Sequence, residues 1–229
     1  MNNVLIVVTS CNSGGKHQQP CGIWLDHLAI PYYIFRSAGI GITFASPTGG
    51  AAPFDLSSVQ APRVSATGLR FYKDCEARSA LADTLKLSQV YPLDFQAVFY
   101  AGGAGVLWDL VDSTASQNLL KYVCQQRIPL ALLGHGPAAL LKVKYQKNKS
   151  IVTGHSVTSL SLAEETSLFG RGRLPFQLQQ QLISQGAIYH STAAGSACVA
   201  ENEYYITGQN TSSAPLLCQS LMQRMGYQC

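Results

Sequence analysis

The fold is decided by one stretch, Ile128-Pro-Leu-Ala-Leu-Leu-Gly-His-Gly-Pro-Ala-Ala-Leu-Leu141. Residues 128–133 form an apolar run of strand length, and residues 135–141 are typical of the helix that follows a strand. A buried strand that turns sharply into a helix is an elbow that lifts one side chain above a parallel sheet. The residue at this turn is Gly134. The sequence therefore predicts that the position at which such an elbow carries its nucleophile has no side chain here.

Strands and helices alternate along the rest of the chain. Residues 4–8 are an unalternating apolar run, as expected for a strand buried on both faces. We predict further strands at 40–45, 97–100, 197–200 and 204–207, two short β segments within 151–163, and helices at 22–38 (broken at Pro31), 75–88, 116–126, 176–185 and 213–225. This order favours one α/β domain over residues 1–229, a three-layer sandwich with a central, mostly parallel sheet. Residues 51–70, rich in Pro, Ser and Ala, are predicted to be a loop insertion.

Ligands of such sheets bind beyond the carboxyl ends of the strands. Three predicted strands end in residues that could carry or shape a site: Cys11, Gly102 to Gly105, and Gly134 with His135. We therefore expect these residues to lie in one neighbourhood, around a pocket for a small-molecule ligand.

Composition narrows the class of partner. Only 12% of the residues are charged, about half the usual share, which is consistent with a surface covered by a second subunit. The basic residues of a +4 chain cluster only at Lys142, Lys144, Lys147 and Lys149, which we interpret as a solvated loop, so no nucleic-acid binding is expected. No apolar run approaches the roughly 20 residues that span a bilayer, so no membrane association is expected.

The seven cysteines include no Cys-x-x-Cys pair and no zinc-ribbon spacing. We interpret them as free thiols in a reducing, cytoplasmic environment. Cys11, His17, Cys21, His27 and His135 are of types that bind zinc, but their spacing matches no metal motif, so no metal and no cofactor are expected.

Several motifs together carry a family resemblance. They are residues 4–10 (VLIVVTS), 22–33 (GIWLDHLAIPYY), 44–50 (FASPTGG), 101–105 (AGGAG) with 108–110 (WDL), 134–140 (GHGPAAL) and 206–214 (ITGQNTSSA). In these motifs the chain resembles the ThiJ/PfpI superfamily, the class I glutamine amidotransferase-like group of Parkinson-disease protein 7, and most of all its heat-shock, glyoxalase III-like branch. The resemblance implies a flavodoxin-like sandwich and a homodimer.

The resemblance also implies a site. Members of the family usually act through a Cys nucleophile, the His beside it, and a Glu on the first helix that shuttles protons. The Cys corresponds to Gly134, the Glu to His27 and the His to His135, so one of the three groups remains. Because two partner groups are lost together, the chemistry of the family is expected to be lost, although the scaffold is not.

Alternatives remain for the individual residues. His27 either fills the space left by the lost groups or acts as a relocated acid–base group. The N–H groups of Gly103 and of the residue after Gly134 could form an oxyanion hole, with Gly102 beside them. Cys11 or Cys21 could be a displaced nucleophile.

We also expect Asp26, about 100° around the helix from His27, to be solvated. The leading hypothesis is a non-catalytic or divergent member, a pseudoenzyme that binds a small carbonyl or acyl metabolite or a protein partner. The first alternative is an enzyme of altered mechanism, a lyase or hydrolase in which His27 and His135 activate water. The second is a chaperone-like stress-response protein.

Overall fold

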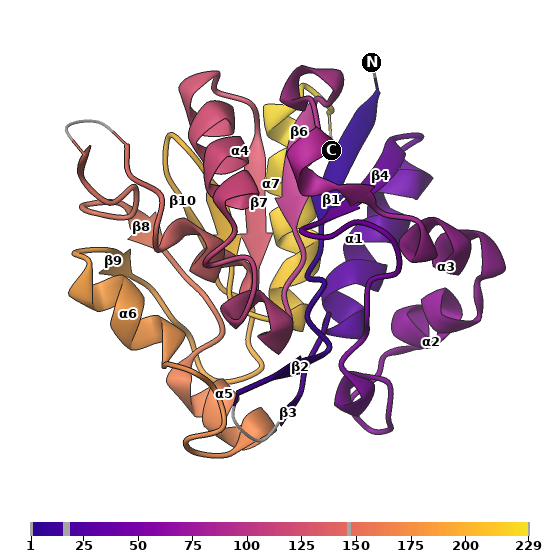
Figure 1. Cartoon of the computed structure of the whole chain (residues 1–229), viewed down its shortest axis with the longest axis horizontal. Coiled ribbons are helices and arrows are strands. Elements are labelled where there is room, and N and C mark those ends of the chain that lie inside the picture. Colours follow the sequence, from indigo (N-terminus) through magenta and orange to yellow (C-terminus); the bar gives the residue numbers. More distant parts are fainter. Residues whose placement is uncertain (1, 16–18, 146–147, 229) are drawn as a thin grey trace.

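A seven-stranded sheet forms the centre of the molecule, in the order β10-β11-β7-β6-β1-β4-β5 (Figure 1). The computed structural model describes residues 2–15, 19–145 and 148–228. The strands are β1 (Asn3–Val7), β4 (Gly41–Ser46), β5 (Leu85–Lys86), β6 (Ala97–Tyr100), β7 (Leu130–Leu133), β10 (Val199–Glu201) and β11 (Ile206–Gly208). Only β10 is antiparallel to its neighbour within this sheet. The predicted α/β sandwich is confirmed.

Helices cover both faces of the sheet, as Figure 1 shows. On one face lie α1 (Leu25–Ser37) and α7 (Ala214–Arg224), and on the other lies α4 (Thr114–Gln125). Alternate residues of β1 enter the two cores: Val4 and Ile6 pack with α1 and α7, while Leu5 and Val7 pack with α4. A strand covered on both faces needs apolar residues at every position, which explains the unalternating run in the sequence.

The chain between β4 and β6 contains more helix than predicted. The expected loop at 51–70 includes a 3₁₀ turn at Leu56–Ser58 and the start of α2 (Ala66–Lys73), which is followed by α3 (Cys75–Ala82). Helix α2 begins there because the Ser65 hydroxyl caps it by accepting the N–H of Gly68 at 3.0 Å. The loop prediction was therefore wrong at its C-terminal end, and the helix predicted at 75–88 ends at Ala82.

Asp26 anchors this region, and the expectation that it is solvated was wrong. Its side chain is buried and accepts the hydroxyl of Ser65 at 2.7 Å and the N–H of Ser65 at 3.0 Å. The carboxylate therefore fixes the start of α2 against α1. Helix α1 itself continues through Pro31 without the predicted break, since one proline removes only one backbone hydrogen bond from a helix packed against the sheet.

The segment after β7 departs most from prediction. Instead of two β segments, residues 151–163 contain one two-residue strand, β8 (Ser156–Val157), which pairs with β9 (Ile188–Tyr189) outside the main sheet. Helices α5 (Leu162–Phe169) and α6 (Leu178–Ser184) follow and form a lobe beside the sheet (Figure 1). A small hairpin of β2 (Ser13–Gly14) and β3 (Gln19–Pro20) lies next to this lobe. No helix of the described residues is long and apolar enough to cross a bilayer.

Candidate functional site

The predicted elbow is present between β7 and a 3₁₀ helix at Gly136–Leu140. Gly134 has φ +60°, the left-handed conformation that glycine adopts without steric cost. Its N–H donates to the carbonyl of Gly208 at 2.9 Å, and its own carbonyl accepts the N–H of Leu160 at 3.0 Å. The elbow is thus held from both sides, by the end of β11 and by the chain that leads into α5.

The ring of His27, on α1, occupies the space where an elbow side chain would stand. A Cβ built on Gly134 would lie 2.6 Å from Nδ1 of His27, and a Cβ on Gly102 would lie at the same distance from that atom. Both distances are well inside van der Waals contact. His27 and a side chain at position 134 therefore exclude one another, which gives the paired loss in the sequence a steric reason.

Burial keeps the His27 ring neutral. The side chain is 3% exposed, and Nδ1 is a buried nitrogen without a hydrogen-bond partner among the described residues. Burial, and secondarily the nearby His135, lowers the pKa of His27 to about 3. A group with this pKa carries almost no positive charge near neutrality, so the geometry favours space filling over acid–base work.

The glycines proposed as an oxyanion hole lie beneath this ring. Gly102, Gly103 and Gly134 are all buried, and none of them is among the residues that line the adjoining cavity. Gly103 packs against the chain before α1, because a Cβ there would lie 2.5 Å from the backbone nitrogen of Trp24. This placement disfavours ligand contact with their N–H groups.

A cavity of about 310 Å³ opens above His27 and His135. Its aromatic walls are continuous: Trp24 lies 6.2 Å from His27 and 6.0 Å from Phe169 between ring centroids, and Phe169 lies 5.6 Å from His135. The remaining lining comes from α5 and the residue that leads into it, from the loop between β9 and β10, from the turn after β11 and from the chain before α2. These residues are Arg63, Leu160, Glu164, Ser167, Leu168, Ala194, Gly195, Asn210, Thr211 and Ser212. An apolar pocket with a few polar groups is typical of a small-molecule site.

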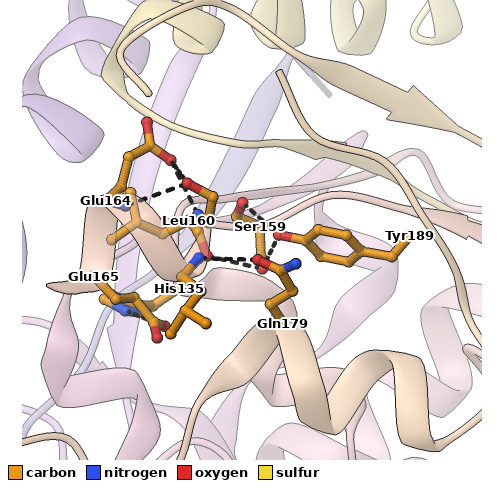
Figure 2. A network of polar contacts seen from close by, with 9 residues as sticks. His135, Ser159, Leu160, Glu164, Glu165, Gln179 and Tyr189 are labelled. Atoms are coloured by element: carbon orange, nitrogen blue, oxygen red, sulfur yellow. Dashed lines mark hydrogen bonds and ion pairs between the residues drawn. The ribbon is translucent and has the colours of Figure 1, made fainter. Parts of the chain in front are cut away.

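His135 is paired with a carboxylate from α5. Nε2 of His135 lies 3.2 Å from a carboxylate oxygen of Glu165, and both side chains are almost completely buried (Figure 2). If Nε2–H donates to the carboxylate, Nδ1 is left with a lone pair that can accept a proton or a hydrogen bond. Glu165 therefore fixes the ring of the one histidine that remains from the family's three groups.

The neighbouring Glu164 is satisfied within the protein. Its two oxygens accept hydrogen bonds from the Gly195 N–H, the Asn210 and Gln209 amides, and both the N–H and the hydroxyl of Ser161, at 2.7–3.0 Å. Burial acts to raise the pKa of Glu164, but these hydrogen bonds outweigh it and leave the pKa below its usual value. Glu164 remains ionised and has little capacity left for a ligand.

Sequence reasoning missed both of these acids. Two short β segments were predicted within residues 151–163 and no element for residues 164–175, although Ser161-Leu-Ala-Glu164 is a capping-box signature, and the structure has both of its hydrogen bonds. Arg63, at the mouth of the cavity, was hidden in the predicted loop. It forms no ion pair with an acidic side chain in the part of the chain that the structure describes.

The candidate thiols lie elsewhere. Cys11 and Cys21 face one another at the β2–β3 hairpin, and neither lines the cavity above His135. No group of three or more metal-binding side chains occurs among residues 2–15, 19–145 and 148–228. His17 and Lys147 lie outside those ranges. The described cysteines are free thiols.

Fold and site together define a doubly wound α/β protein with a strand-to-helix elbow whose reactive position is a glycine. The sequence profile of the DJ-1/PfpI family matches residues 27–224, and the chain belongs to that family.

Three relatives illustrate its range. The human glutamine amidotransferase-like class 1 domain-containing protein 1 is 24% identical over 83% of both chains. The glutathione-independent glyoxalase hsp3102 of Schizosaccharomyces pombe is 28% identical over 64% of this chain and 63% of its own. The solved structure of the Rapid Encystment Protein 24 kDa of Francisella tularensis is 28% identical and superposes with a TM-score of 0.91 over 98% of this chain and 99% of that one. The resemblance to the glyoxalase III-like branch, inferred from the sequence, is thereby confirmed.

Proposed function

We propose that this chain binds small carbonyl or acyl compounds reversibly in the cavity above His27 and His135, without forming a covalent intermediate at the elbow. One observation carries the proposal: His27 fills the space in which a nucleophilic side chain at position 134 would stand. The cavity that remains has the size and the mixed lining of a metabolite site.

The charges around the cavity favour an anionic ligand. His27 is neutral near neutrality, and the Glu164 carboxylate is occupied by internal donors. Arg63 is a cation at the mouth of the cavity that lacks an acidic partner among the described residues. A small 2-oxo acid would place its carboxylate at Arg63, which suits the fork of donors on a guanidinium, and its carbonyl towards the polar lining residues Thr211 and Ser212.

Calorimetric titration with glyoxylate and pyruvate tests this proposal, with hydroxyacetone as the uncharged comparison. We expect the 2-oxo acids to bind more tightly than hydroxyacetone, and Arg63→Ala to weaken their binding roughly tenfold, since one charge-assisted hydrogen bond is lost. Arg171→Ala removes the same charge at an exposed position that does not line this cavity, and should leave affinity unchanged. Equal binding by the native chain and Arg63→Ala would refute the assignment.

A second function, hydration or hydrolysis of a small electrophile, is favoured by the His135–Glu165 pair. In that mechanism Nδ1 of His135 would accept a proton from water, with Glu165 stabilising the charged ring. His27 cannot share the task near neutrality because its pKa is about 3. This function requires that His135→Ala abolish turnover, and unchanged turnover in that variant would exclude it.

The family resemblance leads us to propose a cytoplasmic homodimer as well. Light scattering coupled to size exclusion would give about twice the chain mass of 24.6 kDa. A mass equal to one chain at micromolar concentration would contradict this proposal.

A further inference from the structure

Two cysteines meet outside the cavity, at the base of the β2–β3 hairpin. The Sγ atoms of Cys11 and Cys21 lie 3.3 Å apart, although nine residues separate the two in sequence. A disulfide bond is about 2.0 Å long, so the sulfurs would need to approach by little more than 1 Å.

Backbone hydrogen bonds of both cysteines hold the two sulfur atoms close to one another. The hairpin pairs Ser13 with Pro20, and the N–H of Cys21 continues the ladder by donating to the Asn12 carbonyl at 3.1 Å. The N–H of Cys11 donates to the hydroxyl of Thr9 at 3.0 Å.

Thr9 is in turn anchored, because its hydroxyl donates to the half-buried carboxylate of Asp109 at 2.8 Å. The sulfurs are therefore held near one another by two anchored segments. Forming the bond consequently costs little further conformational entropy.

The two thiols differ in access. Cys11 is partly exposed and can meet an oxidant from solvent. Cys21 is buried but lines a groove of about 400 Å³ next to the hairpin. Burial, followed by the hydrogen bond and charge of Cys11, raises the pKa of the Cys21 thiol. Cys11 is consequently the residue that reacts first, and Cys21 the one that completes the bond.

We propose that Cys11 and Cys21 form a reversible intramolecular disulfide by exchange with a small-molecule disulfide such as oxidised glutathione. The Cys11 thiolate attacks one sulfur of the reagent and expels one glutathione thiolate. The Cys21 sulfur, after losing its proton, attacks Cys11 Sγ and expels the second. Two protein thiols are oxidised to one disulfide, one glutathione disulfide is reduced to two thiols, and the two protons from the protein end on those thiols. This proposal is independent of the ligand that the cavity binds.

Trypsin provides a direct readout. Cleavage after Lys16 separates Cys11, in peptide 1–16, from Cys21, in peptide 17–36, so the two peptides remain joined only by a disulfide. The full chain would be equilibrated with excess oxidised glutathione, quenched with acid, alkylated in denaturant, digested, and examined by mass spectrometry. We expect most of the two peptides to be joined, and excess dithiothreitol to release them.

Variants make the assignment specific. Cys11→Ser and Cys21→Ser should each abolish the joined peptide, whereas Cys75→Ser, which removes an exposed thiol outside the hairpin, should leave its yield unchanged. Tryptophan emission supplies a second measurement on the undigested chain, because a Cβ on Gly15 of the hairpin would lie 3.1 Å from the Trp108 ring. Emission should change on oxidation of the native chain and not of folded Cys11→Ser. Free peptides, or peptides each carrying glutathione, after full equilibration would overturn the proposal.

Discussion

The cavity has a floor, formed by His27 on α1, and a wall, formed by α5. Each contains a buried ionisable group, and the two groups differ in whether they keep their charge. On the floor, His27 is enclosed beside Gly102 and Gly134 with one nitrogen unpartnered, and burial lowers its pKa to about 3. On the wall, Glu164 is also buried, but hydrogen bonds to its carboxylate keep its pKa below the usual value. One group gives up its charge, and the other keeps it.

This difference indicates which part of the site keeps its charged and hydrogen-bonding groups. The wall retains an ionised carboxylate, an oriented His135–Glu165 pair and a set of amide donors. The floor has replaced a reactive position with a packed ring. This packed floor is consistent with the proposal that the site holds a ligand rather than attacks it.

The largest expected effect is a loss of stability when the buried carboxylate of Glu164, on the wall, is removed. Glu164→Ala leaves the donors of Gly195, Asn210 and Gln209 without an acceptor, and we expect a loss of about 4 kcal/mol in the free energy of unfolding. Urea denaturation measures it. Glu201→Ala, which breaks an exposed ion pair with Arg224, should cost less than about 1 kcal/mol. Equal losses in the two variants would remove the contrast between wall and surface.

The next effect concerns the floor. Gly134→Ala places a Cβ against the His27 ring at φ +60°, and we expect it to cost about 3 kcal/mol in the native background. In a His27→Ala background the steric part disappears, so the cost should fall to about 1 kcal/mol, the backbone strain alone. The double-mutant cycle measures this coupling directly. Additive losses would show that the ring does not exclude a side chain at the elbow.

A smaller effect is the response to acid. His27 has a pKa of about 3 when folded and about 6.5 when unfolded, so the unfolded chain binds the proton more readily. Its contribution to stability is complete above pH 6.5 and is lost as the pH falls towards 3. From pH 7.5 to 5.0 the loss is about 2 kcal/mol.

The pH dependence of the unfolding free energy should therefore be shallower in His27→Gln than in the native chain over that range. The comparison is made against the variant because other buried groups also titrate. Identical slopes would mean that the ring is not buried as a neutral group.

The sheet and the elbow could be predicted because their signals are local and redundant. Residues 4–8 and 128–141 carry apolar runs and a glycine turn whose interpretation needs no tertiary contact. Residues 151–163 were mispredicted because short mixed stretches of Val, Thr, Ser and Leu suit a strand, whereas here a capping box at Ser161 starts a helix.

The residues of the candidate site also divide into those that could be predicted and those that could not. Gly134, His27 and His135 were found from motifs, and the structure brings the three together. Glu165 pairs with His135, and Arg63 lines the cavity, each from a distant segment, and no spacing in the sequence indicates either placement. Asp26 was misjudged because its partner, Ser65, lies 39 residues away.

Turnover of methylglyoxal to lactate tests the central claim, that His27 closes the elbow to chemistry. The native chain, His135→Ala and the double variant Gly134→Cys with His27→Glu would be assayed side by side at equal concentration, with folding confirmed by circular dichroism. We predict no turnover above buffer in the native chain or in His135→Ala, and measurable turnover in the double variant, whose thiol and carboxylate take the space of the ring. Turnover by the native chain that His135→Ala abolishes would contradict the account.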